Sequence, residues 1–314
     1  MAIRVLEGGL QTTVQGLRRQ GLRHQGVPWA GAADPLSLML ANRLVGNKSH
    51  APALEITYGP FRAQFTEASQ IALTGAPMSA MLGGHSVVHH QTIDVVAGNE
   101  LILTPSRTGA RTYLSVDGGI EVPKFMGSAS TYLPAAFGGF HGRVLGAGDL
   151  LDIRAASPVT TPLSTPRVLQ PFMGHDWVLR VCRGAEAGRV IGSSWQEFLT
   201  SSWTVSRRSD RIGCLLEGEP LQLTDAGVMK SAPVFPGTVQ CPPDGQPFLL
   251  GIDAQTTGGY LRIAHVIRPD RHRIGQLRPG DRVRFQEVTP RESTAVLREK
   301  ISSLSQWLGP VVLY

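Results

Sequence analysis

The sequence VLGAGDLLDI at residues 144–153 recurs in similar form as IGQLRPGDRVRF at residues 274–285, and more loosely as VAGNELIL at residues 96–103. In each copy a glycine followed by aspartate or asparagine predicts a tight turn, and the apolar or alternating residues after it predict a β-strand. Two related β lobes are the simplest interpretation, although an ordinary β-turn that recurs by chance gives the same pattern.

A proline-rich stretch, AASPVTTPLSTPRVLQP at residues 155–171, separates the first two copies. Proline breaks helices and interrupts central strands, so we interpret residues 156–171 as a linker or a long crossover. The expected organisation is an N-terminal β lobe at residues 1–155 and a C-terminal β lobe at residues 172–314.

Composition places the chain among globular proteins. Its 314 residues are 42% hydrophobic and 17% charged, which excludes a disordered tail, a coiled coil and a collagen-like fibre. The 36 glycines and 22 prolines predict a mainly β fold with short strands and tight turns. The start of the chain lacks the apolar core of a signal peptide, and three cysteines without C-x-x-C spacing argue against disulfides and structural zinc. We expect a cytoplasmic protein without a membrane span.

Three helices have clear start signals. Asp34 before Pro35 is typical of an N-cap with proline at the first helical position. Ser194 with Glu197 has the spacing of a capping box and predicts a second helix that begins at Ser194. An apolar stripe at spacings of four, three and four residues predicts a terminal helix over residues 290–308.

Several function classes are disfavoured. The net charge is +6, but the basic residues are scattered, which argues against nucleic acid as a partner. The chain has no phosphate loop, no G-x-S-x-G elbow and no H-E-x-x-H zinc motif. His85, His89 and His90 could approach a metal, but alternation along a strand separates adjacent side chains, so we interpret them as exposed strand histidines and expect no metal site.

Four segments combine glycines with polar side chains, at residues 11–34, 127–143, 205–218 and 239–260. Glycine lets backbone amides approach a ligand closely, so each segment could line a polar cleft. Each also has a simpler interpretation. Asp210 could form an Asx-turn or a surface ion pair, and the Gly258–Gly259 pair could be a tight hairpin.

Taken together, these segments resemble a known family over nearly the whole chain. The motifs TTVQ, GVPWAGAADPLSLMLANRLVGN, LEITYGP, ALTGAP, RTYLSVDGGIEVP and GSASTY occur in the first half, and VSRRSDRIGCLLEG, VQCPPDGQPFLLGIDAQTTGGYLRIAHVI and QLRPGDRVRF in the second. In order and spacing they are similar to the biotin-dependent carboxyltransferase family, which includes allophanate hydrolase subunit 2 and the C subunit of 5-oxoprolinase. The resemblance implies two cyclophilin-like β-barrel lobes with a few short helices.

The resemblance also implies a function within a complex. The chain has no biotin-carboxylase region and no A-M-K-M carrier motif, which favours the oxoprolinase branch, where separate subunits together convert 5-oxoproline, ATP and water to glutamate, ADP and phosphate. The implied partners are a sister subunit of similar fold and a lactam-hydrolase subunit, and the implied cofactor is ATP in the complex. Two alternatives stay open: a carboxyltransferase subunit of a biotin-dependent urea carboxylase, and a non-catalytic regulatory subunit of the kinase-inhibitor-antagonist type.

On this interpretation, loops from both lobes bind one small anionic molecule. Opening a lactam with ATP calls for anion-binding groups, a proton acceptor and orienting polar groups. The expected catalytic residues are Asp210, Asp253 and Arg211, with either aspartate as proton acceptor or metal-facing carboxylate. The expected substrate-binding residues are Gln15, Arg19, His24, Asp34, Gln255, Thr257, Gly258, Gly259 and Tyr260. The chain departs from the usual family pattern at Gly16, Arg18, Cys214 and Leu215.

Overall fold

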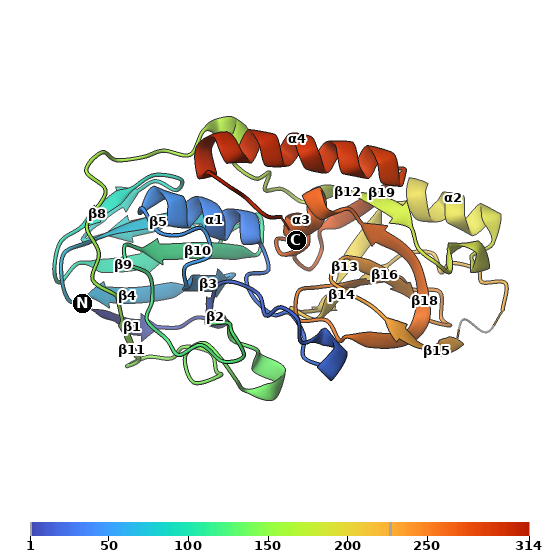
Figure 1. The fold of residues 1–314 in the computed structure, drawn as a ribbon, viewed down its shortest axis with the longest axis horizontal. Coiled ribbons are helices and arrows are strands. Elements are labelled where there is room, and N and C mark those ends of the chain that lie inside the picture. The colour runs from blue at the N-terminus through green and yellow to red at the C-terminus, as the bar shows by residue number, and fades with distance from the viewer. Residues whose placement is uncertain (1, 226–227, 314) are drawn as a thin grey trace. The chain divides into compact units, whose positions relative to one another are not determined.

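The computed structural model describes residues 2–225 and 228–313, which form two compact units. Unit 1 comprises Met1–Arg19 and Ala30–Met173, and unit 2 comprises Gln20–Trp29 and Gly174–Tyr314. Short strands dominate both units (Figure 1), and the expectation of a mainly β fold is confirmed. No helix among the described residues combines the length and the apolar character needed to cross a bilayer.

The unit boundaries differ from the expected lobes at two places. Residues 156–171 are part of unit 1, where the Val159 amide donates to the Gln70 side chain and Thr92 bonds to the Leu163 backbone. Residues 20–29 belong to unit 2, although they lie early in the chain. The Arg23 guanidinium explains the second difference, because it donates to the carbonyl oxygens of Val234 and Gln255 in unit 2.

Unit 1 contains two antiparallel sheets. The first has the strand order β11-β1-β4-β9-β6-β7, with bounds Leu150–Asp152, Ala2–Glu7, Phe61–Phe65, Glu100–Leu103, Ala80–Leu82 and His85–Val87. The second has the order β2-β3-β10-β5-β8, with bounds Gln11–Gln15, Ala53–Thr57, Arg111–Val116, Ser69–Gly75 and Ile93–Val95. One continuous apolar core draws residues from both sheets.

Helix α1, Pro35–Leu44, covers the five-stranded sheet and packs on β5 and β10 (Figure 1). Strands β3, β5 and β10 are consequently buried along their whole length, whereas β4 alternates between buried and exposed positions. The predicted N-cap is confirmed, since the Asp34 side chain accepts hydrogen bonds from the Ser37 amide at 3.0 Å and the Ser37 hydroxyl at 2.6 Å.

Unit 2 contains one sheet of eight strands in the order β12-β19-β13-β14-β17-β16-β18-β15. Their bounds are Asp176–Arg183, Arg282–Glu287, Trp203–Ser209, Gly213–Glu217, Phe248–Leu250, Thr238–Cys241, Thr257–Val266 and Val228–Pro233. An additional pairing between β12 and β18 closes the sheet on itself. Among the described residues, closure pairs each strand except β15 with at least two neighbours, and β15 pairs with β18.

The remaining helices lie mostly in unit 2. Helix α2 spans Gly192–Thr200, so the predicted start at Ser194 is wrong by two residues: Ile191 is the N-cap, and the Ser194 hydroxyl instead accepts from the Gln222 amide. Helix α4 spans Pro290–Leu308, with the Thr289–Glu292 capping box formed. The short helices are α3, Arg271–Ile274, and the 3-10 turns Arg23–Gln25, Leu133–Ala135, Arg167–Leu169, Ala187–Arg189 and Arg268–Asp270.

The recurring glycine turns are confirmed. Gly98, Gly148 and Gly280 have φ values of 84°, 93° and 89°, and each lies two residues before a strand, β9, β11 or β19. This left-handed conformation favours glycine, which explains why the same residue recurs at all three positions.

The capping box of α4 gives a first prediction. Replacement of Thr289 by alanine removes the side-chain acceptor for the Glu292 amide and should lower the free energy of unfolding by about 0.5–2 kcal/mol. Urea denaturation followed by tryptophan fluorescence measures the change. Ser302→Ala, at an exposed position of the same helix, serves as the control and should change stability by less than about 0.5 kcal/mol.

Candidate functional site

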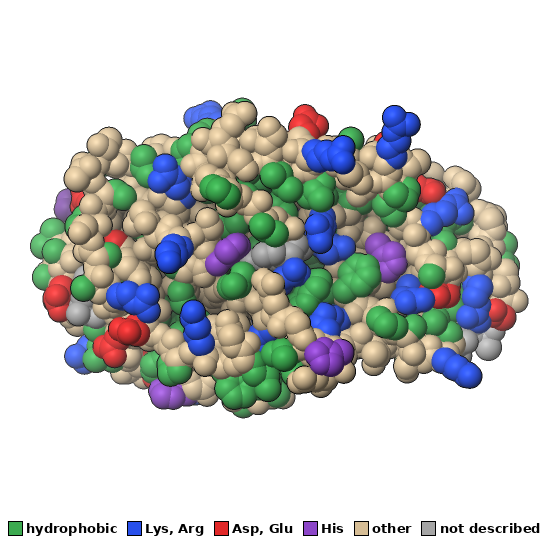
Figure 2. All heavy atoms as spheres, in the orientation of Figure 1, with side chains coloured by type: hydrophobic (Ala, Val, Ile, Leu, Met, Phe, Trp, Pro, Cys, Tyr) green, Lys and Arg blue, Asp and Glu red, His purple; other side chains and the backbone are tan. Residues whose placement is uncertain are grey.

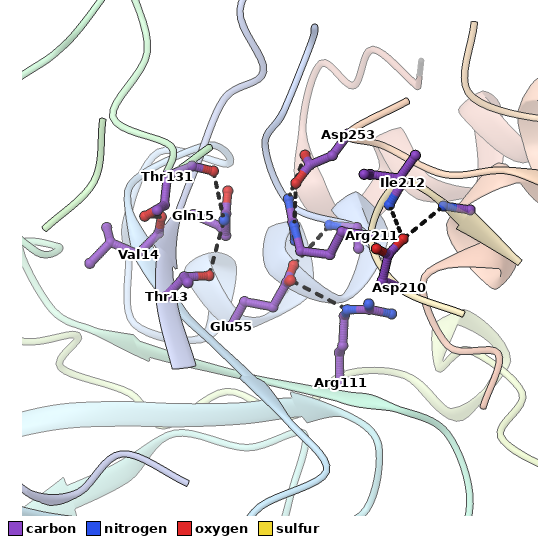
Figure 3. A network of polar contacts seen from close by, with 12 residues as sticks. Thr13, Val14, Gln15, Glu55, Arg111, Thr131, Asp210, Arg211, Ile212 and Asp253 are labelled. Carbon is purple, nitrogen blue, oxygen red and sulfur yellow. Dashed lines mark hydrogen bonds and ion pairs between the residues drawn. The ribbon is translucent and has the colours of Figure 1, made fainter. Parts of the chain in front are cut away.

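In unit 1, Gln15 lies at the end of β2 with its side chain fully buried. Its Nε2 atom donates to the Thr13 hydroxyl at 3.0 Å and to the Thr131 carbonyl at 3.2 Å (Figure 3). Its Oε1 atom is also buried and has no hydrogen-bond partner among the described residues. A buried acceptor of this kind is costly unless a ligand or water satisfies it, so Gln15 is a strong candidate for a ligand contact.

Arg19 lies beside the same segment and is 1% exposed. Its Nη2 atom donates to the Ser130 carbonyl at 2.6 Å, and its guanidinium lies 4.6 Å from the centre of the Phe137 ring. Gly138 and Gly139, in the segment at residues 127–143, lie close to Arg19 and Thr131. A Cβ atom on Gly138 would lie 2.3 Å from Arg19 Nη2, and one on Gly139 would lie 1.9 Å from the Thr131 hydroxyl.

Asp34 is held in a buried polar network with three residues that the sequence analysis missed. The Asp34 amide donates to the Tyr113 hydroxyl at 2.7 Å, and this hydroxyl donates to Glu55 Oε2 at 2.6 Å. Glu55 also accepts from the Ala33 amide and pairs with Arg111 at 3.4 Å (Figure 3). Burial, with the nearby charges of Glu55 and Asp34, raises the pKa of Tyr113 well above its ordinary value and keeps the hydroxyl protonated.

Removal of the Tyr113 hydroxyl tests this network. Tyr113→Phe leaves the Asp34 amide without its acceptor and should lower the free energy of unfolding of unit 1 by about 1–3 kcal/mol. Unit 1 contains none of the five tryptophans, so its unfolding is followed by far-UV circular dichroism. Tyr260→Phe, at a position 46% exposed in unit 2, is the matched control, and an equal loss in both variants would contradict the assignment.

In unit 2, Arg211 and Asp253 form a buried ion pair. Arg211 Nε lies 2.8 Å from Asp253 Oδ2, and Nη2 lies 3.1 Å from Oδ1, so the contact is bidentate (Figure 3). The Asp253 amide also donates to the Arg211 carbonyl at 3.0 Å. Both side chains are at most 5% exposed. The two hydrogen bonds fix the position of the Asp253 carboxylate in the loop between β17 and β18.

Asp210 has a different environment, although it adjoins Arg211 in sequence. It lies exposed in the hairpin between β13 and β14, where Oδ1 accepts from the amides of Ile212 at 2.7 Å and Gly213 at 3.2 Å. This is an Asx-turn, the simpler of the two interpretations given by the sequence. A catalytic role for Asp210 stays a prediction.

Gln255 lies at the centre of a second cluster in unit 2. Its side chain donates to Gln240 Oε1 at 3.3 Å, and its carbonyl accepts from Arg23 at 3.1 Å. Gln240 is 1% exposed, and its Nε2 atom has no hydrogen-bond partner among the described residues. Burial lowers the pKa of the Arg23 guanidinium, whose plane lies 5.0 Å from the Trp29 ring centre. His24 follows Arg23 as an exposed residue of the same 3-10 turn.

The remaining predicted ligand residues begin β18. Gly258 pairs with Ala232 and Tyr260 with Val228 of β15, so the double glycine is part of a strand and the hairpin interpretation is wrong. A Cβ atom on Gly258 would lie 2.6 Å from Gln240 Nε2, which explains why glycine fits there. Thr257 and Tyr260 are exposed.

The structure thus brings the predicted residues into local groups within each unit. Gln15 and Arg19 share the Ser130–Thr131 segment, and Arg211 pairs with Asp253. The expectation that both lobes hold one ligand stays a prediction. The missed residue with the clearest sequence signal is Glu55, because it is a charged residue between the apolar Leu54 and Ile56 of β3. Arg111, Arg23 and Gln240 have no such signal.

The histidines and cysteines add no chemical centre. His85 is exposed on β7, while His89 and His90 follow the strand half-buried, and burial with the neighbouring His89 charge lowers the pKa of His90 to about 4. Across residues 2–225 and 228–313, no three histidine, cysteine or acidic side chains gather at metal-binding geometry. Burial raises the pKa of Cys241 to about 12 and keeps this thiol protonated. Lysine and arginine side chains are scattered in small groups among acidic ones on the face drawn in Figure 2.

The fold is that of a carboxyltransferase domain. The family described as carboxyltransferase domain, subdomain A and B, matches residues 25–287, and the chain belongs to this family. It is 38% identical over 291 residues to the C subunit of 5-oxoprolinase from Escherichia coli (strain K12), a match that covers 93% of each chain. It is 34% identical over 304 residues to the C subunit of 5-oxoprolinase from Haemophilus influenzae (strain ATCC 51907 / DSM 11121 / KW20 / Rd), with 97% of each chain covered.

A solved structure extends the likeness. The crystal structure of the K. lactis urea amidolyase superimposes with a TM-score of 0.92 at 28% identity, and the match covers all of this chain. The chain spans only 20% of that structure's length. The same domain therefore occurs as part of a much larger polypeptide as well as in chains of this length.

Proposed function

We propose that the chain is a subunit of an ATP-dependent 5-oxoprolinase. The observation that carries this proposal is the end-to-end match to two proteins named as the C subunit of 5-oxoprolinase, which extends over at least 93% of every chain compared. The reaction converts 5-oxoproline, ATP and water to glutamate, ADP and phosphate. The partners are a sister subunit and a lactam-hydrolase subunit, and the location is the cytoplasm.

Two buried amide side chains support a lactam as the substrate. Gln15 Oε1 in unit 1 is an acceptor without a hydrogen-bond partner among the described residues, and the N–H of a lactam can donate to such an atom. Gln240 Nε2 in unit 2 is a buried donor that also has no hydrogen-bond partner among the described residues, and a carbonyl or carboxylate oxygen can accept from it. In each unit taken by itself, a substrate group that completes such a hydrogen bond lowers the cost of burying the amide atom.

The Arg211–Asp253 pair has a positioning role in this proposal. Its carboxylate is bound by two guanidinium nitrogens, so Asp253 is poorly suited to accept a proton while the pair is intact. We assign the pair to holding the loop before β18, which carries Gln255, in a fixed geometry. Arg19 is retained as an anion-binding residue because it is buried and ordered by Ser130 and Phe137.

The nucleotide is assigned to the assembled complex. The chain lacks a phosphate loop, and the described residues include no set of three acidic, histidine or cysteine side chains suited to the magnesium ion that usually accompanies ATP. These residues therefore do not by themselves fit a nucleotide site.

Carboxyl transfer is the second candidate function. The observation that favours it is the TM-score of 0.92 against the urea amidolyase structure over the whole of this chain. In that case the cofactor is biotin on a separate carrier, and the acceptor is urea or a related amide.

One experiment separates the two candidates. The purified chain is mixed with the sister and lactam-hydrolase subunits and ATP, and glutamate is measured with 5-oxoproline as substrate. A parallel mixture contains a biotin carboxylase, a biotinylated carrier, bicarbonate and urea. We expect glutamate in the first mixture and no carboxylated urea in the second, and the reverse result would reject the oxoprolinase proposal.

A further inference from the structure

A hollow of about 440 Å³ lies within unit 1 and is lined in part by Phe137 and Gly138, two of the residues beside Arg19. Glu121, Phe125 and Asp152 line one part of it, which we call the first wall. The loop at residues 136–142, which includes Phe137 and His141, lines another part, which we call the loop wall. We call the hollow itself the Phe137 hollow. Its volume suits a small molecule.

The first wall presents two carboxylates. The Glu121 amide donates to the Asp152 carbonyl at 2.8 Å, which holds the two residues side by side. Both residues are exposed, and neither carboxylate has a hydrogen bond or ion pair with another described residue. A ligand that places an ammonium group here forms charge-assisted hydrogen bonds.

The loop wall supplies backbone amides. The amides of residues 138–141 form a consecutive run, and none of them donates to another residue in the described part of the chain. Gly138, Gly139 and His141 have φ values of 71°, 54° and 54°. Successive N–H groups in a turn with left-handed residues form concavities that bind anions, so this wall suits a carboxylate.

Aromatic rings complete the lining. The rings of Phe125 and Phe137 lie 4.9 Å apart, and Phe125 is 43% exposed. The loop is also tightly fixed, since a Cβ atom on Gly142 would lie 2.1 Å from the Ala136 carbonyl oxygen. A rigid apolar surface between the groups that bind the ammonium and the groups that bind the carboxylate reduces the conformational entropy lost on binding.

We propose that the Phe137 hollow binds a free α-amino acid with an apolar side chain. The ammonium group bonds to Glu121 and Asp152, the carboxylate accepts from the amides at 138–141, and the side chain contacts Phe125 and Phe137. Gln15 and Arg19 are not among the residues that line this hollow. The Arg19 guanidinium lies over the Phe137 ring. A bound amino acid that contacts this ring therefore contacts a direct neighbour of Arg19, which is a predicted substrate-binding residue.

The test is equilibrium binding of L-phenylalanine to the full chain by calorimetry, with amide hydrogen exchange to locate the site. We expect a dissociation constant on the order of 0.1–1 mM, and slower exchange of the amides at residues 138–141. The double variant Glu121→Gln, Asp152→Asn should bind at least ~10-fold more weakly, because both ammonium partners lose their charge. Glu219→Gln, an exposed site in unit 2, should bind as the unaltered chain does.

Two analogues of L-phenylalanine, each without one of its charged groups, test the two subsites separately. N-acetyl-L-phenylalanine lacks the ammonium group, and phenethylamine lacks the carboxylate. Each should bind at least ~10-fold more weakly than L-phenylalanine, and the acetylated ligand should not distinguish the double variant from the unaltered chain. The proposal is overturned by no binding of L-phenylalanine up to ~20 mM, by equal binding to the double variant, or by binding that leaves exchange at 138–141 unchanged. None of these outcomes depends on whether the chain takes part in 5-oxoproline cleavage.

Discussion

Replacement of Arg211 by alanine is expected to lower the free energy of unfolding of unit 2 by about 3–5 kcal/mol. The substitution leaves the Asp253 carboxylate, which is 2% exposed, without the bidentate contacts that offset its burial. All five tryptophans belong to unit 2, so urea denaturation followed by tryptophan fluorescence reports on this unit alone. In the assembled complex, glutamate formation should fall at least ~100-fold, because the loop that carries Gln255 loses its fixed geometry.

A double variant separates stability from function. Arg211→Met with Asp253→Leu removes both charges and fills similar volume, so most of the lost stability should return. Glutamate formation should stay low, because the two side-chain hydrogen bonds between the loops are still absent. If the double variant recovers activity together with stability, the pair is only a folding element and its positioning role is wrong.

Gly138→Ala is expected to have the second largest effect, a loss of about 2–5 kcal/mol in unit 1. About 1–2 kcal/mol comes from placing a side chain at a φ of 71°, and the rest from overpacking. The new Cβ atom would lie 2.2 Å from the Ser130 carbonyl oxygen and 2.3 Å from Arg19 Nη2. Far-UV circular dichroism during urea denaturation measures the loss.

Gly127→Ala is the matched control in the same segment. Gly127 has a φ of 77°, and a Cβ atom added there would have no heavy atom of another residue within 4 Å. The Gly127→Ala variant should lose only the stability that the left-handed backbone conformation costs an alanine, about 1–2 kcal/mol. Equal losses of unfolding free energy in the two variants would show that the close approach of Gly138 to Ser130 and Arg19 does not contribute to the destabilisation.

Local signals predicted much of the fold. The Gly-Asp and Gly-Asn turns, the Asp34 cap and the Thr289 capping box depend on residues within a few positions of one another, and the structure has all of them. The path of residues 20–29 into unit 2 was not predictable in this way. It depends on contacts between Arg23 and the carbonyl oxygens of Val234 and Gln255, which lie more than 200 residues further along the chain.

The candidate site shows the same limit at single residues. Asp210 and Arg211 are adjacent and were both expected to be catalytic, but the hairpin leaves Asp210 in an exposed turn, while Arg211 is buried against Asp253. Glu55 in ALEIT was a readable signal, because a carboxylate among apolar strand residues must be satisfied by partners such as Tyr113. The sequence could not predict that Gln15 Oε1 and Gln240 Nε2 have no hydrogen-bond partner among the described residues. Whether such an atom has a partner depends on every residue that surrounds it in the folded chain.

The most direct test of the account is an omission and add-back assay for ATP-dependent glutamate formation. The sister and lactam-hydrolase subunits, ATP and 5-oxoproline are mixed without this chain, and the purified chain is then added in increasing amounts. We predict no glutamate above background without the chain, and formation that rises and saturates at a fixed ratio of the chain to its partners. Equal glutamate formation with and without the chain, or none at any ratio, would contradict the assignment.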